Sequence, residues 1–387
     1  MQPRPAPPRS ASVVIVGGGI IGASAAFHLA EAGVDGVVLV ERDQLGSGST
    51  GRAAGGVRAQ FSDALNVRIA TRSLAAFADF GRRPGWEIDF KRVGYLFVLA
   101  RDQDCAAFER GAAVQRELGA PIRMIAPDEV NRRCPLVAVD DVLAGAFAPD
   151  AGHATPEAAV QGYASAARRL GARIETRCEA LAVGRRAGAI SELITDRGAI
   201  ATDSVICAAG AWSAEVAAMA GVELPVTPVR RQVLFTAPIP GLPDELPMTI
   251  DFATSFYFHR EGPGLLLGMS HERDPVTFSL ETSDEWVPTL LAVAERRAPA
   301  VAAAGIKGGW AGLYEMSPDH NAMIGESSSV PGFFYATGFS GHGFLQGPAV
   351  GEILRDLYLR RDPFVDVSPL SAERFAAGEP RPELNVI

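Results

Sequence analysis

The chain contains 387 residues, of which 48% are hydrophobic and 21% charged, and its formal net charge is −9. This composition is typical of a globular protein that is large enough for two or three domains. The acidic balance, without a basic stripe, argues against nucleic acid or an anionic membrane as a partner, and the lack of an apolar run of about 18 residues argues against a membrane-spanning helix.

The first residues and the cysteines indicate where the protein resides. Residues 1–10 are rich in proline and lack the apolar core of a signal peptide, so we expect a flexible tail there. Cys105, Cys134, Cys178 and Cys207 lack the spacing of a metal site. Isolated thiols of this kind are typical of reduced, buried side chains, and we therefore expect a cytoplasmic protein.

A dinucleotide-binding motif follows this tail. Residues 13–16 are all apolar and β-branched, and they lead into Gly17, Gly19 and Gly22, which open a helical run over residues 23–32. In such a strand, turn and helix, the first glycine allows the tight turn and the second lets the backbone approach a pyrophosphate. The third lets helix and strand pack closely. The helix N-terminus then offers unpaired N–H groups to the phosphates.

An acidic residue follows at the distance that this motif requires. Glu41 ends a second apolar strand, VVLVE, nineteen residues after Gly22. A carboxylate in this place can accept hydrogen bonds from both ribose hydroxyls, and it disfavours the additional phosphate of NADP. We include its neighbour Arg42 and the first helical residues, Ile20 and Ile21, in the predicted cofactor site.

The loop after Glu41 is too rich in glycine and serine to be a regular element before about Phe61. A loop in this place lies near the phosphates and can bring the hydroxyls of Ser49 and Thr50 to them. A flexible linker is the alternative that the composition leaves open. The other residues of this loop that we assign to the cofactor site are Arg52, Ala53, Gly55 and Gly56.

The rest of the chain alternates between helical and extended patterns. Helices are expected over residues 65–80, 103–118, 128–133, 156–170 and 284–297. The stretch 204–213, SVICAAGAWS, ends in small residues that let a ligand come close, and we expect the nucleotide-binding sheet to resume there. Residues 222–268 contain short strands separated by proline and glycine, which predicts a largely antiparallel sheet. A last strand, GFFYATG, precedes a glycine-rich loop over residues 338–343 and a helix.

Four of these segments together resemble the family of FAD-dependent amine and amino-acid oxidoreductases that includes glycine oxidase, sarcosine oxidase and D-amino-acid oxidase. They are the first glycine turn with Glu41, the loop STGRAAGG, the strand VICAAGAWS and the later GFSGHGF. They occur in the family's order, and the resemblance covers nearly the whole chain. It implies FAD as the cofactor, and it is closest to proteins likened to the sarcosine oxidase β-subunit and to dimethylglycine dehydrogenase.

The resemblance also implies roles for individual residues. Glu41 would bind the adenosine ribose, Ser49 and Thr50 the pyrophosphate, and the last glycine loop the pyrimidine edge of the flavin. A helix N-terminus there would stabilise the negative charge of the reduced flavin. His342 would add a donor, with a purely structural hydrogen bond as the alternative. The cofactor residues that we assign from the later segments are Ala180, Ala208, Gly210, Trp212, Gly338, Gly341, His342, Gly343, Phe344 and Leu345.

Three departures from the family pattern bear on the chemistry. Tyr314 stands where the glycine and D-amino-acid oxidase branch has an arginine that binds the substrate carboxylate. Gly312 stands where monomeric sarcosine oxidases have a cysteine bonded to the flavin, and we therefore predict non-covalent FAD. Leu266 and Leu345 stand where that branch has lysines, one of which assists the reaction with oxygen, and this argues against fast oxidase activity.

The chemistry implied by the resemblance is the transfer of a hydride from a carbon attached to nitrogen to flavin N5, followed by hydrolysis of the imine. The protein must orient the C–H bond and desolvate the amine, so no acid–base triad is expected. The side chains that we predict on the substrate side are Arg58, Arg230, Tyr257, His259, Tyr314 and His342.

The residues of this substrate set have alternatives that the sequence leaves open. Arg58 would bind a carboxylate with two hydrogen bonds, or else form a surface ion pair. Tyr257 stands where the family places an aromatic ring over the flavin, and a core aromatic is the alternative. Arg230 and Arg231 point to opposite faces if they lie in a strand, so at most one of them can face the site.

Together these observations predict an α/β fold with two domains. A discontinuous Rossmann-like FAD-binding domain would cover residues 11–84, 145–220 and 325–365, and an inserted, largely antiparallel substrate domain would cover 85–144 and 221–324.

The predicted function is oxidation of the C–N bond of a small amine that resembles an N-methyl amino acid. A D-amino-acid dehydrogenase or oxidase with an atypical carboxylate anchor, and an FAD-binding subunit of a hetero-oligomeric dehydrogenase, are the alternatives. The partners would be the amine and an electron acceptor such as oxygen or a quinone, and an oligomer is compatible with the sequence.

Overall fold

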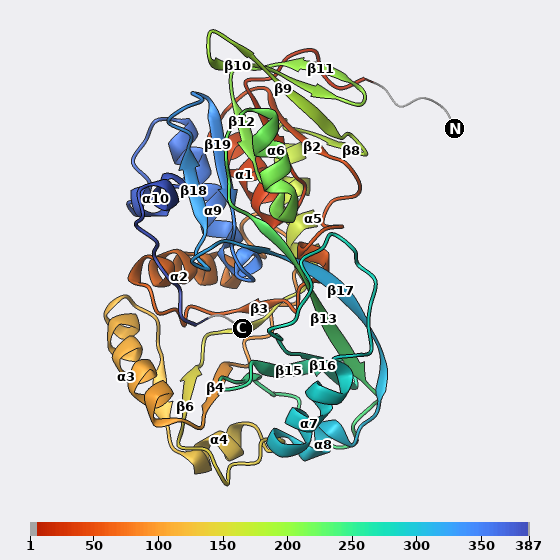
Figure 1. Ribbon diagram of the computed structural model, residues 1–387, viewed down its shortest axis with the longest axis vertical. Helices are drawn as coiled ribbons and strands as arrows, with labels where there is room; N and C mark the ends of the chain where they lie inside the picture. The colour runs from red at the N-terminus through yellow and green to blue at the C-terminus, as the bar shows by residue number, and fades with distance from the viewer. Residues whose placement is uncertain (1–5, 386–387) are drawn as a thin grey trace.

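A computed structural model describes residues 6–385 of the chain. Two large β-sheets form its frame, a six-stranded sheet in the upper part of Figure 1 and an eight-stranded sheet in the lower part. No helix within the described residues combines the length and the apolar character that a membrane span requires.

The six-stranded sheet is the nucleotide-binding sheet that the sequence predicts. Its strand order is β18 (Met323–Glu326), β19 (Phe333–Thr337), β12 (Val205–Cys207), β1 (Val13–Val16), β2 (Val37–Glu41) and β8 (Arg173–Thr176). All neighbours pair in parallel except β18 with β19. Because the strands come from separate parts of the chain, the predicted discontinuous Rossmann-like domain is confirmed.

Both faces of this sheet are covered, which explains why β1 and β2 are apolar without interruption. Val13 and Ile15 pack in one core with the helices α1 (Ile20–Glu31), α5 (Pro156–Arg169) and α9 (Gly343–Tyr358). Val14 and Val16 pack in a second core on the opposite face.

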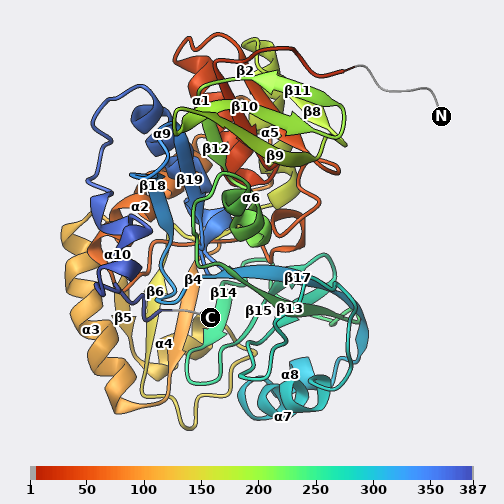
Figure 2. The same cartoon turned by 45° about the horizontal axis from the view of Figure 1, so that its top comes forward.

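The second core lies under a small antiparallel sheet and the helix α6 (Ser213–Met219). This sheet consists of β9 (Ala180–Arg186), β10 (Ala189–Thr195) and β11 (Gly198–Ala201), and it is not among the predicted elements. Figure 2 shows it in front of α1 and α5.

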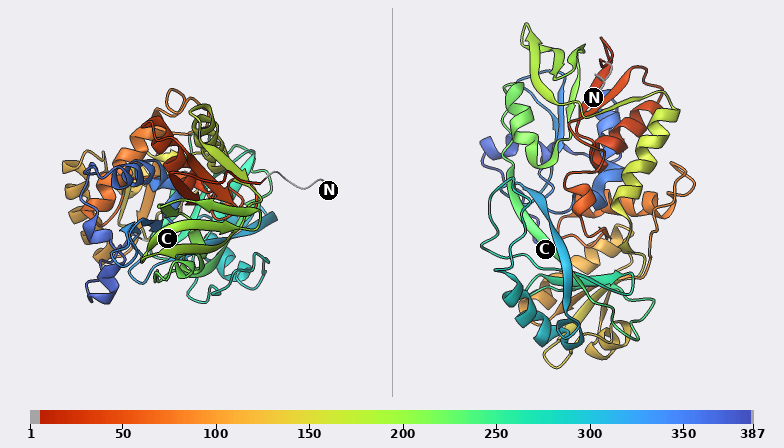
Figure 3. Two further views of the ribbon diagram at one scale, coloured as in Figure 1. Left: turned by 90° about the horizontal axis from the view of Figure 1, so that it is seen from above. Right: turned by 90° about the vertical axis from the view of Figure 1, so that its right-hand side faces the viewer.

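The eight-stranded sheet is largely antiparallel, as predicted. Its order is β17 (Ile306–Met316), β13 (Thr227–Thr236), β16 (Gly264–Gly268), β15 (Phe256–Glu261), β14 (Met248–Asp251), β4 (Tyr95–Leu99), β6 (Ala144–Ala148) and β5 (Arg123–Ile125). Only β14 and β4 pair in parallel among these neighbours. Figure 3 shows β13 and β17 as a long ribbon that reaches from the lower sheet toward the upper one.

The two faces of the eight-stranded sheet differ in what they contact. One face packs Phe256 and Phe258 against the helices α7 (Val287–Arg297) and α8 (Pro299–Ala302). The other face carries Tyr95, Met248 and Tyr257, which line a cavity between the two sheets. Because side chains alternate along a strand, the core of the lower sheet and its functional face are built from neighbouring residues.

The helices predicted from the apolar periodicity are present at nearly the predicted positions. They are α2 (Ala64–Ala78), α3 (Asp102–Glu117), α4 (Pro127–Arg133), α5 and α7. The remaining short elements are η1 (Thr50–Arg52), β3 (Gly56–Val57), β7 (Gly152–His153), η2 (Gly210–Trp212), η3 (Ser368–Leu370) and α10 (Glu373–Ala376).

The predicted domain limits differ from the sheets at three places. Residue 145 falls inside β6, because β6 pairs with β4 and completes the lower sheet before the chain returns. β18 begins at Met323, so the upper sheet resumes before residue 325. Of the expected tail, residues 1–5 lie outside the described residues, whereas Ser10 forms a parallel bridge with Ala201 of β11.

Candidate active site

A cavity of about 520 Å³ lies between the two sheets. One end is formed by the β1–α1 turn, the end of β2 and η2, and the other by β13, β14, β15, β17 and the start of α9. Most of the predicted cofactor residues line it: Gly17, Gly19, Ile20, Ile21, Glu41, Arg42, Ser49, Thr50, Arg52, Ala53, Gly55, Gly56, Ala180, Ala208, Gly210, Trp212, Gly341, His342, Gly343, Phe344 and Leu345.

The first glycine turn is fixed by close backbone contacts. Gly17 has a φ of +116°, and a Cβ atom there would lie 2.2 Å from the carbonyl oxygen of Ala208. A Cβ at Gly22 would lie 1.9 Å from the carbonyl oxygen of Gly17. Gly22 is outside the cavity lining, so it acts through the predicted close packing of helix on strand and not as a contact residue.

Three polar side chains of the loop after Glu41 lie near the start of α1, and two of them carry a buried atom without a hydrogen-bond partner in residues 6–385. Thr50 Oγ1 accepts a hydrogen bond of 3.2 Å from the backbone N–H of Ile20. Ser49 Oγ and Arg52 Nε are buried and find no hydrogen-bond partner in residues 6–385. Buried polar groups are rarely left unpaired, and with the helix N-terminus these two groups fit a pyrophosphate.

The end of the cavity at the close of β2 carries the predicted acid, Glu41, in a fixed orientation. Glu41 Oε2 accepts a hydrogen bond of 2.7 Å from Gly18 N–H, and Oε1 accepts one of 2.8 Å from Asp43 N–H. Beside it, the Arg42 guanidinium lies 4.0 Å from the ring centroid of Trp212. These contacts orient the carboxylate and form an apolar and cationic wall next to it.

The loop η1 is docked on β17, which ties the loop after Glu41 to the lower sheet. Trp310 Nε1 donates a 2.9 Å hydrogen bond to the carbonyl oxygen of Arg52, and Arg52 Nη1 donates one of 3.2 Å to that of Ala311. A Cβ at Gly312 would lie 3.0 Å from Arg52 Cβ. A cysteine at position 312 would therefore be crowded by Arg52.

Glu315 is a lining residue that the sequence analysis misses. Its Oε2 accepts hydrogen bonds from Thr337 Oγ1 at 2.7 Å and from Gly338 N–H at 3.1 Å. Burial raises its pKa to about 7, and the two hydrogen bonds limit this rise because they stabilise the ionised carboxylate. Glu315 follows Leu313 at strand spacing, and a carboxylate on the buried face of a strand is a signal that could have identified it.

Arg58 and His342 form a buried pair at the other end of the cavity. The side chain of Arg58 is only 1% exposed, and Arg58 Nη2 lies 3.2 Å from His342 Nε2. Burial and then the adjacent Arg58 cation lower the pKa of His342 well below its ordinary value, so the imidazole is neutral. Because a guanidinium can only donate, Nε2 is the acceptor in this hydrogen bond.

Arg58 has no carboxylate partner within the described chain. Its Nη1 donates to the carbonyl oxygen of Gln60, and its guanidinium carbon lies 4.5 Å from the ring centroid of Phe61 and 5.3 Å from that of Phe97. Carbonyl oxygens and ring faces solvate this cation without neutralising it. Within residues 6–385, no carboxylate therefore neutralises the Arg58 cation by direct contact.

Tyrosine hydroxyls complete the same end. Tyr257 and Tyr314 line the cavity, and no hydrogen bond of either hydroxyl is found within residues 6–385. Burial raises the pKa of both phenols above the ordinary value, and it raises the pKa of Tyr95 to about 12. All three are thus neutral hydrogen-bond donors at physiological pH.

Besides Gly22, three predicted residues lie outside the cavity lining. On β13, Arg231 faces the cavity and Arg230 the opposite side, which corrects the predicted choice between them. His259 is covered by the ring of His153 at a centroid distance of 4.3 Å, because β7 packs over this part of β15. Gly338 does not line the cavity and instead donates its N–H to Glu315.

The fold and this site define a flavoenzyme of the kind that the sequence resembles. The model of the FAD-dependent oxidoreductase family DAO matches residues 12–357, and the chain belongs to this family. FAD is therefore its cofactor. The unpaired polar groups at the start of α1 and the oriented carboxylate of Glu41 fit the phosphates and the ribose of that molecule.

Curated relatives match nearly the whole chain. The 4-methylaminobutanoate oxidase (formaldehyde-forming) of Paenarthrobacter nicotinovorans is 30% identical over 381 residues, which are 95% of this chain and 46% of that protein. The FAD-dependent oxidoreductase domain-containing protein 1 of Xenopus laevis is 31% identical, over 98% of this chain and 86% of that protein. The chain spans about half the length of the first of these relatives and of the mammalian sarcosine and dimethylglycine dehydrogenases.

Solved structures show the same fold. L-proline dehydrogenase from P. horikoshii superposes with a TM-score of 0.92 at 32% identity and covers 97% of this chain and 100% of its own. Glycine oxidase from Geobacillus kaustophilus gives a TM-score of 0.84 at 26% identity, with 95% and 99% covered.

Proposed function

We propose that this protein oxidises the C–N bond of a small secondary or tertiary amine that carries a carboxylate, such as an N-methyl or cyclic amino acid. The observation that carries the proposal is Arg58, a buried cation without a carboxylate partner among residues 6–385 at the cavity end that holds Tyr257 and Tyr314. The names of the relatives, which include sarcosine and L-proline dehydrogenases, agree with such a substrate.

The charge at this end favours an anion. Arg58 and Arg231 line it, and although Arg231 pairs with Asp274, its Nε atom is buried without a partner in the described chain. Glu315 has a pKa of about 7, so its charge opposes these cations only in part. A carboxylate that replaces water beside a buried cation gains more than it would at the surface.

The bound FAD would accept a hydride from the carbon attached to the substrate nitrogen. The work of this chain is to bind the carboxylate through Arg58, to orient the amine beneath the rings of Tyr257 and Tyr314, and to exclude water. The neutral Tyr257 and Tyr314 can donate hydrogen bonds to the substrate. Because their pKa values are raised, neither acts as a base at physiological pH.

The cofactor is proposed to be held without a covalent bond. Gly312 offers no nucleophile, and Arg52 occupies the space beside it. If the cofactor is free, acid precipitation of the purified protein leaves the yellow colour in the supernatant. Colour that stays with the pellet would show that another side chain is bonded to the flavin.

The substrate class is tested by anaerobic bleaching of the flavin absorbance. We expect sarcosine, dimethylglycine and L-proline to bleach the protein at least ten times faster than dimethylamine, trimethylamine and pyrrolidine, which are the same three amines without the carboxylate. Equal rates for both sets would show that no carboxylate anchor exists. Faster bleaching by D-alanine would favour the alternative of a D-amino-acid dehydrogenase.

The electron acceptor is proposed to be other than oxygen. Leu345 lines the cavity and Leu266 is buried in the sheet below it, and the described lining contains no lysine. After substrate reduction, we expect the flavin to be reoxidised faster by a soluble quinone than by air. Faster reoxidation by air would make the protein an oxidase.

A further inference from the structure

The segment after α10 carries buried polar groups although it belongs to no helix or sheet. We call residues 379–385 the C-terminal strap. Glu383 in it is only 2% exposed and Asn385 9% exposed. In Figure 1 the dark blue trace of this segment leaves α10 and runs below α2 toward the middle of the molecule.

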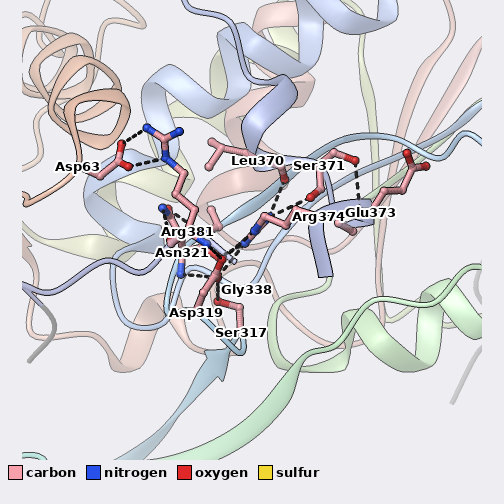
Figure 4. Close-up of polar contacts among 12 residues, drawn as sticks. Asp63, Ser317, Asp319, Asn321, Gly338, Leu370, Ser371, Glu373, Arg374 and Arg381 are labelled. Atoms are coloured by element: carbon pink, nitrogen blue, oxygen red, sulfur yellow. Dashed lines mark hydrogen bonds and ion pairs between the residues drawn. The ribbon is translucent and has the colours of Figure 1, made fainter. Parts of the chain in front are cut away.

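The strap is tied down at its start by a network around Asp319. Arg374 of α10 donates two hydrogen bonds, of 2.8 and 2.9 Å, to the carboxylate of Asp319, and both side chains are buried. The backbone N–H of Arg381 donates to the same carboxylate at 2.8 Å, and its guanidinium pairs with Asp63 at the start of α2. Figure 4 shows these contacts. The path of the strap is therefore fixed on both α10 and α2.

Glu383 anchors the strap to the segment that follows Arg58. Its carboxylate accepts hydrogen bonds from Ser62 N–H at 2.8 Å, Ser62 Oγ at 2.7 Å and Asn66 Nδ2 at 2.9 Å. It also accepts one of 3.0 Å from the backbone N–H of Asn385. A buried carboxylate with this many donors holds both chain segments in one arrangement.

The strap ends on the guanidinium of Arg58. The carbonyl oxygen of Asn385 accepts a 2.8 Å hydrogen bond from Arg58 Nη2, the same nitrogen that faces His342. The side-chain amide of Asn385 lies 3.4 Å from the carbonyl oxygen of Gln60, which also accepts from Arg58. Asn385 is outside the cavity lining, so it holds Arg58 from behind.

We propose that the C-terminal strap is a positioning element that sets the orientation of Arg58 toward the substrate carboxylate, with Glu383 as its anchor. An arginine side chain has several rotatable bonds, and Arg58 has no carboxylate in residues 6–385 to fix it. The carbonyl of Asn385 takes one N–H group of Nη2, His342 Nε2 faces the other, and the carbonyl of Gln60 takes one of Nη1. This arrangement leaves the second N–H of Nη1 and the Nε–H group for a carboxylate in the cavity. This inference rests on the proposed role of Arg58 as the carboxylate anchor.

The test is a double-mutant cycle on the holoenzyme. Glu383→Ala removes the anchor, and Arg58→Ala removes the group that the strap positions. Leu384→Ala is the matched control, because the side chain of Leu384 lies next to Glu383 in the sequence and is 70% exposed. With sarcosine and L-proline as probes, we expect Glu383→Ala to raise KM about tenfold or more and to change kcat much less. Leu384→Ala should leave both constants unchanged, and Glu383→Ala should add nothing to the KM of Arg58→Ala.

A second measurement separates the strap from the proposed function. Hydrogen–deuterium exchange of the peptide around residues 56–62 should increase in Glu383→Ala and stay as in the parent in Leu384→Ala. Unchanged exchange and KM in Glu383→Ala would overturn the strap alone. If Arg58→Ala leaves KM unchanged, the carboxylate anchor is wrong, and the catalytic role of the strap falls with it. Should Glu383→Ala not fold, the milder Glu383→Gln carries the same comparison.

Discussion

Gly341 shows how a single backbone position shapes the cavity just before α9 begins. Its φ is +98°, and a Cβ atom there would lie 2.5 Å from Cε2 of Tyr314. We predict that Gly341→Ala lowers the free energy of unfolding of the apoprotein by about 1–2 kcal/mol, because alanine is strained at this φ and the tyrosine must move. Denaturant unfolding measures the change.

The control for this substitution is two residues further along the chain. A Cβ at Gly343 would lie 3.4 Å from its nearest neighbours, and alanine is favoured over glycine in a helix by about 0.5–1 kcal/mol. Gly343→Ala should therefore not destabilise the apoprotein. A loss of stability as large as that of Gly341→Ala would contradict the assignment of strain to Gly341.

Glu315 makes the stability of the apoprotein depend on pH. Burial raises its pKa from 4.5 to about 7, so the folded state holds this proton more tightly than the unfolded state. The contribution of this group to stability is therefore lost as pH rises from 4.5 to 7, and the loss amounts to about 3 kcal/mol. Above pH 7 it remains constant.

The neutral isostere tests this pH dependence. Glu315→Gln keeps an oxygen that can accept from Thr337 and Gly338 but cannot ionise. Urea unfolding of both proteins between pH 5 and 8 should show the variant gaining stability relative to the parent as pH rises. Parallel curves for the two proteins would mean that Glu315 does not titrate in this range.

At the scale of elements, the start of α1 depends on a side chain from another loop. Thr50 Oγ1 accepts from the N–H of Ile20, and no side chain of α1 itself caps this end. We predict that Thr50→Val costs about 1 kcal/mol in the apoprotein, because a helix N–H group loses its acceptor. Thr50→Ser keeps the hydroxyl and should cost clearly less. Equal losses for both variants would point to packing of the methyl group.

At the scale of the whole molecule, FAD should join the two sheets. The cavity is lined by both sheets, so a ligand in it binds only when they are packed together. Calorimetry should show a higher Tm for the holoprotein than for the apoprotein. At a free FAD concentration one hundred times its Kd, the folded state should be stabilised by about 2.7 kcal/mol. AMP, which would occupy only the part of the cavity beside Glu41, should stabilise less than FAD at the same free concentration, because fewer contacts give it a higher Kd. An FAD-independent Tm would contradict this arrangement.

The sequence predicted best where the determinants are contiguous. The turn at Gly17, the acid Glu41 and the hydroxyl of Thr50 lie within one strand, turn, helix and strand unit, whose geometry follows from local rules. Along β13, the alternation predicted that at most one of Arg230 and Arg231 faces the site but not which one. The choice depends on which face of the lower sheet meets the cavity, and that is decided by α7 and α8 on the other face.

The amino-acid sequence by itself thus determined the fold class, the cofactor family and the groups that we propose for the ribose and the phosphates. The tertiary structure decided the arrangement of the proposed substrate end. The contact between Arg58 and Asn385 joins residues 327 positions apart, and Glu315 meets Thr337 only because β17 and β19 converge. The physical reason is that such contacts have no local pattern, since they exist only after both cores have packed and brought distant backbone segments to hydrogen-bonding distance.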